Sequence, residues 1–258
     1  MSDSDKQIAA AAKFVVDLDL PPLSSPSRSS EGGLSDKLKP ITQVQSLAVG
    51  HGVVSFLGGL PSRHRETVAN TFLLAQLVAD HRVHAQESMD QWYLAFFDVL
   101  RKLGWLIQEQ HFSEYSKQGA GVEIQEAILN IAATLLGSAS AGYQVVKSTL
   151  EGLRKLSERD WITIFRKEDQ ESSGDIFQVA VASPTEDGNI SISLMAFLLQ
   201  AKATRVRVLF FKWDNAVVSL RHATATVVYT NAVSAGVRKL VADKVKSYTT
   251  DYVTSLDI

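Results

Sequence analysis

The chain of 258 residues contains no cysteine. This absence excludes a disulfide scaffold, a zinc site built on thiolates and a thiol nucleophile. It leaves the compartment open, because cytosolic and exported proteins alike can lack cysteine. The N-terminus, MSDSDK at 1–6, is acidic and a poor secretory signal. We therefore expect a cytoplasmic protein or one exported by a non-classical route, and peripheral attachment to a membrane fits either case.

Familiar catalytic signatures are also missing. The sequence has no Gly-x-Ser-x-Gly elbow, no P-loop and no His-Glu-x-x-His. Gly50-His51-Gly52 fits no phosphate-binding spacing, so we interpret it as a tight packing loop. His81 and His84 are three residues apart, but the sequence places no further ligand beside them, and we expect a solvated helix end. We predict no catalytic residue and no metal site.

A strong overall charge is lacking as well, since the formal net charge is −2. We therefore expect no nucleic-acid partner. Residues 200–250 are an exception, with nine Lys or Arg against two Asp. This segment either presents a basic face to an anionic surface or forms a solvated strand edge and helix face, and the sequence leaves both open.

Proline is concentrated near the N-terminus, where four of the six prolines lie between residues 20 and 40 beside a serine-rich run. Proline removes backbone donors and serine favours solvated turns, so this stretch predicts a linker. A short helix at 7–17 precedes it. We predict a flexible, dispensable segment at residues 1–40 and a single α+β domain at residues 41–258.

Two hydrophobic periods divide the predicted domain. A helical period indicates helices at 66–82 and 90–103, and another that begins at Asn231. A period of two indicates strands of a half-buried sheet at 161–166, 176–183, 190–199, 205–213 and 217–229. We predict an α+β fold, an antiparallel β-meander of four to five strands packed against N-terminal helices and a C-terminal helix. The residues expected to face the helices are Ile190, Ile192, Leu194, Val206, Val208 and Phe210.

Residues 127–146 carry no formal charge over twenty positions, which is the length of a transmembrane span. A Gly/Ser-rich block at 137–142 interrupts the apolar pattern. This break favours two buried helices joined by a short turn over a single span. Insertion into a membrane is the alternative.

Several structural and aromatic motifs resemble the Erwinia virulence factor (Evf) family. They are VSFLGGL at 54–60, FLLAQLVA at 72–79, QWY at 91–93, LGW at 103–105, GDIFQV at 174–179 and DGN at 187–189. The resemblance runs from about residue 45 to 248. It implies a single α/β domain related to a protein that promotes bacterial persistence in an insect gut and carries a fatty acyl group on a cysteine.

The acylated position of that family corresponds here to Ala182, so the resemblance implies no thioester in this chain. An oxygen ester on Ser183 is conceivable. Otherwise a lipid such as palmitate is held non-covalently, lipid binding is lost, or an original cysteine at this position was replaced. We predict a lipid pocket at Phe177, Ala180, Ala182 and Ser183, with a non-covalently bound fatty acid as the one conceivable cofactor. The alternative is that neighbouring Phe and Trp side chains fill this space.

The leading hypothesis is a virulence-factor-like, non-enzymatic protein that has an apolar pocket for a fatty acyl chain or other lipid and associates with membranes. Its expected partner is a lipid or a membrane surface, and the sequence does not indicate an oligomeric state. One alternative is an enzyme acting on a small apolar or acyl substrate in the same pocket. Another is a membrane-inserting, pore-forming toxin that uses residues 127–146.

Overall fold

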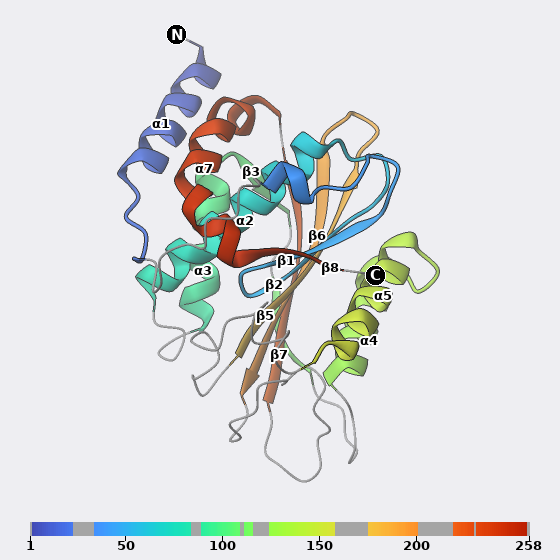
Figure 1. The fold of residues 1–258 in the computed structure, drawn as a ribbon. Helices are drawn as coiled ribbons and strands as arrows, with labels where there is room; N and C mark the ends of the chain where they lie inside the picture. The colour runs from blue at the N-terminus through green and yellow to red at the C-terminus, as the bar shows by residue number, and fades with distance from the viewer. Residues whose placement is uncertain are drawn as a thin grey trace.

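Helices cover both faces of an eight-stranded sheet in the computed structural model, which describes residues 2–22, 34–83, 89–108, 111–115, 124–157, 175–200, 219–229 and 231–256 (Figure 1). The helices are α1 (Asp3–Asp17), α2 (Ser62–Arg82), α3 (Met89–Lys102), α4 (Ile124–Leu136), α5 (Ala141–Lys155) and α7 (Asn231–Tyr252), with a 3-10 turn η1 (Leu34–Lys37). The strands are β1 (Gln45–Val49), β2 (Gly52–Phe56), β3 (Trp105–Ile107), β4 (His111–Tyr115), β5 (Asp175–Pro184), β6 (Ile190–Gln200), β7 (Ser219–Tyr229) and β8 (Val253–Leu256).

The order of the strands in the sheet is β3-β7-β6-β5-β2-β1-β8, and β4 also pairs with β7. Every pairing is antiparallel except that of β2 with β5. The predicted α+β class and the antiparallel meander are confirmed by β5, β6 and β7, which lie side by side. Because β6 pairs directly with β7, no strand lies between them. The expected strands at 161–166 and 205–213 fall outside the described residues.

The two faces of the sheet carry separate cores. The larger core joins the sheet to α1, α2, α3 and α7, and the smaller core joins it to α4 and α5. Figure 1 shows these two helical layers on opposite sides of the strands. Ile190, Ile192 and Leu194 belong to the larger core, as predicted, while Val206, Val208 and Phe210 are not described. The sheet is covered on both faces, so the expectation of a half-buried sheet is corrected.

Five of the described strands were not predicted, namely β1, β2, β3, β4 and β8. All side chains of β1 and β2 are buried. A strand buried on both faces has no need to alternate apolar and polar residues, so the period-two signal is weak there. The parallel pairing of β2 with β5 is also long-range in sequence, and local patterns do not report it.

The predicted pair of helices in residues 127–146 is confirmed. Helix α4 ends at Leu136, and Gly137 has a φ of 81°, a left-handed conformation that glycine adopts without steric cost. Helix α5 then begins after Ser140, whose side chain accepts a hydrogen bond from the backbone N–H of Tyr143. The chain therefore reverses direction within the uncharged stretch.

Helix α1 packs on α7 instead of standing apart from the domain. Ala11 and Val15 are buried in the larger core, and Ile8 fills the space in front of Gly236. Tyr248 of α7 donates a hydrogen bond to the carbonyl oxygen of Pro21 at 2.7 Å. The described part of residues 1–40 thus contributes to the packing. That the segment is dispensable for folding stays a prediction.

Candidate functional site

The four residues predicted to line a lipid pocket lie on β5, which directs them to opposite faces of the sheet. Ala180 and Ala182 belong to the larger core, whereas Phe177 belongs to the smaller one. Ser183 follows the alternation toward the side of Phe177, is half-buried and donates a hydrogen bond to the carbonyl oxygen of Ser191 at 3.4 Å. The strand therefore brings the two alanines together and separates them from Phe177 and Ser183.

Small side chains on the larger-core face of the sheet share that core with large aromatic ones from α2, α3 and the start of β3. The small residues are Ala180, Ala182, Ala196, Ala223 and Ala225. The aromatic residues are Phe72, Trp92, Tyr93, Phe96, Phe97 and Trp105, and they pack on one another with ring centroids 5.0 to 6.4 Å apart. Pairing of small with large side chains is the usual way a core reaches its density. The arrangement resembles the filled-core alternative, while the lipid-pocket prediction remains untested.

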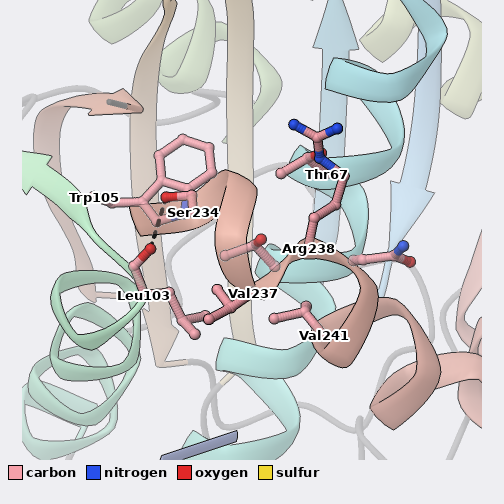
Figure 2. Close-up of a pocket in the computed structure, with 9 residues that line it drawn as sticks. Thr67, Leu103, Trp105, Ser234, Val237, Arg238 and Val241 are labelled. Atoms are coloured by element: carbon pink, nitrogen blue, oxygen red, sulfur yellow. Dashed lines mark hydrogen bonds between the residues drawn. The ribbon is translucent and has the colours of Figure 1, made fainter. Parts of the chain in front are cut away.

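A small cavity of about 10 Å³ lies between α2, the start of β3 and α7 (Figure 2). That volume is close to the minimum that holds one water molecule, whereas pockets for drug-sized ligands measure roughly 300–1,000 Å³. None of the four predicted lipid-site residues lines it. The cavity can hold an ion or a water, but it is far too small for an acyl chain.

The tight loop at Gly50-His51-Gly52 is the turn between β1 and β2, and both glycines are required by close packing. A Cβ at Gly50 would collide with Oε1 of Gln76, and one at Gly52 would collide with the carbonyl oxygen of Gln178. Gly50 also has a positive φ of 49°. The interpretation as a packing loop agrees with this geometry.

His51 anchors this turn to two helices through Asp80. Its Nε2 lies 3.0 and 2.9 Å from the two carboxylate oxygens of Asp80, which also accepts a hydrogen bond of 2.7 Å from Nε1 of Trp92. The imidazole and indole rings meet edge to face with centroids 5.7 Å apart. A histidine paired with a carboxylate is half of a common catalytic arrangement. It also serves as a structural tie.

A second set of polar groups lies beside this pair. Gln76 accepts from the backbone N–H of His51 and donates to Oε1 of Gln178 at 2.8 Å. Tyr93 donates to the carbonyl oxygen of Phe197, and burial holds the pKa of its phenol well above the usual value. A phenol that resists ionisation is a poor nucleophile, so Tyr93 does not complete a recognisable acid–base–nucleophile set with the described groups around His51 and Asp80. The network instead links β1, β2, α2, α3 and β5. The sequence offered no spacing signal that would join these residues.

The predicted absence of a metal site concerned His81 and His84. His81 is exposed in the last turn of α2, and His84 is not among the described residues. Within the described ranges, no group of three or more His, Asp or Glu side chains is placed to hold a metal ion.

The outer surface of the α4–α5 hairpin carries no charge between Glu126 and Lys147. Its exposed residues in that interval are small or neutral: Asn130, Thr134, Gly137, Ser138, Ala139, Ala141 and Gln144. Leu129, Leu135, Leu136 and Tyr143 are half-buried at its margins. At about 1.5 Å per residue, Lys147 lies about 9 Å along α5 from Ala141, and Glu126 lies about 15 Å along α4 from Leu136. We call the loop and flanking turns at 134–144 the neutral tip.

Three hydroxyl groups join α5 to the sheet beneath this hairpin. Oγ of Ser46 lies 2.7 Å from Oγ of Ser55 and 2.7 Å from Oγ1 of Thr149. All three residues are buried, and Thr149 also donates to the carbonyl oxygen of Val145 within its own helix. The smaller core is therefore fixed by a hydroxyl cluster as well as by apolar contacts.

Among the described residues, no helix is both long and apolar enough to cross a membrane. Helix α4 has 13 residues and α5 has 15. These correspond to about 20 and 22 Å of helix, compared with a hydrocarbon core of about 30 Å.

Comparisons with known proteins give distant structural similarity only. No family model and no curated protein matches the chain. A delta-endotoxin structure superposes with a TM-score of 0.45 and 13% identity over 83% of this chain and 91% of that one. The activated Cyt2Ba monomer from Bacillus thuringiensis subsp. israelensis superposes with a TM-score of 0.35 and 17% sequence identity, over 54% of this chain and 79% of that one.

The structure of the Evf virulence factor gives a TM-score of 0.32 and 10% identity over 96% of this chain and 90% of that one. The family that the sequence motifs resemble is therefore among the structurally similar proteins. With scores and identities this low, the similarity assigns the chain to no family and gives it no function.

Proposed function

We propose that this chain is a non-enzymatic, virulence-factor-like protein that associates peripherally with membranes through the neutral tip of the α4–α5 hairpin. The observation that carries the proposal is the exposed, charge-free surface between Glu126 and Lys147. Surface helices are usually charged on their solvent face, and a charge near the hydrocarbon costs several kcal/mol to desolvate. A neutral tip avoids that cost.

The dimensions of the hairpin fit shallow attachment better than a spanning segment. Interfacial elements bury about 5–10 Å into the boundary between headgroups and acyl chains. The neutral length on α5, about 9 Å, matches this depth, and Lys147 would then lie near the headgroups with Glu151 and Arg154 farther out. The half-buried leucines and Tyr143 would supply apolar contact. Because the outermost side chains are polar, the binding is expected to be weak and reversible.

A charge placed on the tip tests the proposal. Ala139 is exposed on the tip, and Ala235 is exposed on α7 in the opposite helical layer. In flotation with liposomes that contain anionic lipid, Ala139→Asp should reduce the bound fraction about tenfold, while Ala235→Asp should leave it unchanged. Absence of binding by the parent protein, or an equal loss in both variants, would refute attachment through the tip.

Binding of a fatty acyl chain is the finer part of the proposal and rests on the family resemblance. It would require space beside Ala180 and Ala182, which are fully buried in the larger core. Replacing Ala182 with Trp should reduce co-purified fatty acid with little loss of stability if a pocket opens there. In a filled core it should lower the free energy of unfolding by about 1–3 kcal/mol through overpacking. Mass spectrometry of the native protein reports any bound lipid directly, and its absence would end the acyl-chain proposal while leaving membrane attachment intact.

A dye-release assay distinguishes pore formation from peripheral attachment. Peripheral attachment predicts flotation with liposomes without leakage of a trapped dye. Leakage that is lost in Ala139→Asp and retained in Ala235→Asp would favour a pore-forming toxin instead.

A further inference from the structure

Two residues that line the cavity between α2, β3 and α7 each carry a buried N–H group with no acceptor among the described residues. They are Nε1 of Trp105 and Nε of Arg238. Figure 2 shows Trp105 at the left of the view, beside Ser234, and Arg238 at the right, all among the residues that line the cavity. Trp105 is only 1% exposed, so water outside the protein cannot satisfy its indole N–H. Buried donors normally have partners, and two orphans lining one cavity indicate a missing acceptor.

Two of the three hydroxyl groups at this cavity donate elsewhere. Ser234 donates to the carbonyl oxygen of Leu103 at 2.7 Å, and Thr67 donates to that of Arg63 at 2.6 Å. Asn70 and Thr71 complete the polar lining from α2. No carboxylate is among the residues that line the cavity. The site therefore offers unpartnered N–H donors and no negative charge.

The surroundings of the cavity are positively charged. Arg238 donates to the hydroxyl of Tyr229 at 3.3 Å and forms no ion pair with a described carboxylate. The pKa of His64 is lowered by burial and then by the charges of Arg63 and Arg238. Arg63 and Arg238 therefore place positive charge beside His64, and Arg238 has no carboxylate partner among the described residues.

We propose that this cavity binds one small monovalent anion, with chloride as the probe, held by the N–H groups of Trp105 and Arg238. An anion accepts hydrogen bonds from both donors and at the same time offsets the guanidinium charge. A water molecule could accept the same bonds and would leave that charge uncompensated. The volume of about 10 Å³ admits a single particle of about the size of water.

Binding at this position would connect three elements. Trp105 begins β3, Arg238 lies on α7, and Thr67 brings α2 to the same point. An anion that binds only the folded state raises stability with the logarithm of its concentration above the dissociation constant. Chloride should therefore stabilise the folded protein in a saturable, site-dependent way, whereas general screening by salt is neither saturable at low concentration nor specific for one anion.

Thermal unfolding in sodium chloride and in sodium gluconate at equal ionic strength tests the site. The parent protein should show a higher melting temperature in chloride, with a midpoint in the millimolar range. Trp105→Phe and Arg238→Gln, each checked for native circular dichroism, should raise that midpoint at least tenfold. Lys239→Gln, on the exposed neighbouring position of α7, should retain the parent response.

A measurement on the unaltered protein keeps the test independent of how the variants fold. Crystals soaked in sodium bromide should show an anomalous peak within hydrogen-bond distance of both Nε1 of Trp105 and Nε of Arg238. Equal melting temperatures in chloride and gluconate, together with no bromide peak, would overturn the proposal and assign the cavity to a water molecule. A chloride response that persists unchanged in Arg238→Gln would overturn it too.

Discussion

The two faces of the sheet differ in how they are packed. On the larger face, four helices enclose an aromatic cluster, and a polar network ties the turn at His51 to α2 and α3. On the smaller face, α4 and α5 are the described helices that cover the strands, through mostly aliphatic residues, Phe177, Phe197 and the hydroxyl cluster at Ser46. The same strands contribute to both cores through alternate residues, with small side chains such as Ala180 on the larger face and large ones such as Phe177 on the smaller face, so the difference arises in the strands as well as in the helices. The larger face is built as a scaffold, while the smaller face carries the surface proposed to meet a membrane.

The difference between the faces predicts the largest effect for a core aromatic residue. Phe96 is fully buried in the larger core and contacts Phe72, Trp92 and Phe97. Phe96→Ala should lower the free energy of unfolding by about 3–5 kcal/mol, as measured by urea denaturation. Leu150→Ala in the smaller core should lower the free energy of unfolding by about 2–4 kcal/mol. A greater loss from Leu150→Ala would reverse the ranking of the two faces.

Removal of α1 tests how far the larger layer extends. A chain that starts at Ile41 loses Ala11, Val15, Leu18 and Leu34 from the larger core. We expect its free energy of unfolding to fall by about 2–4 kcal/mol, because the lost apolar burial exceeds the entropy gained by no longer ordering the segment. Val15 and Val16 provide a matched pair, since they are 1% and 62% exposed. Val15→Ala should destabilise by about 1–2 kcal/mol and Val16→Ala by less than about 0.5 kcal/mol. A melting temperature that stays within a few degrees after truncation would instead confirm the prediction from the sequence that residues 1–40 are dispensable.

The hydroxyl cluster offers a smaller effect on the other face. Thr149→Val keeps the volume and removes the hydroxyl that contacts Ser46, so it should destabilise by about 1 kcal/mol. A double-mutant cycle with Ser46→Ala should give a coupling energy above about 0.5 kcal/mol, because the two residues are in direct contact. Additive losses would show that the cluster does not couple α5 to the sheet.

The smallest effect is the dependence of stability on pH. The pKa of His64 is lowered from its ordinary value of 6.5 by burial and by Arg63 and Arg238. The unfolded chain therefore binds a proton more readily than the folded one, so stability falls as the pH drops below about 6.5. His64→Gln should flatten part of this decline, and His222, whose pKa burial also lowers, accounts for a further part. An unchanged slope in His64→Gln would contradict this assignment.

The sequence predicted the elements whose signal is local and periodic. Residues of β5, β6 and β7 alternate, and the break at Gly137 separates α4 from α5 as expected. The sequence did not indicate β1 and β2, since a strand buried on both faces lacks alternation. The alternation of side chains along a strand already places Phe177 on the face opposite Ala180, but the sequence did not indicate that a second helical layer, α4 and α5, covers that face.

The polar contacts were the least predictable part of the molecule. Asp80, His51 and Trp92 are brought together by the packing of α2 and α3 on the β1–β2 turn, and no spacing in the sequence joins them. The orphan donors of Trp105 and Arg238 lie more than a hundred residues apart along the chain and meet only in the fold. The uncharged interval at 127–146 was visible in the sequence, but its exposure at the hairpin tip required the structure.

Fluorescence of a labelled tip tests the central proposal most directly. Because the chain has no cysteine, Ala139→Cys and Ala235→Cys can each carry a single environment-sensitive dye. On addition of liposomes containing anionic lipid, the dye at Ala139→Cys should shift to the blue and gain intensity, while the dye at Ala235→Cys should not respond. If the dye at Ala139→Cys remains in a water-like environment under conditions where the protein floats with liposomes, the neutral tip is not the membrane contact.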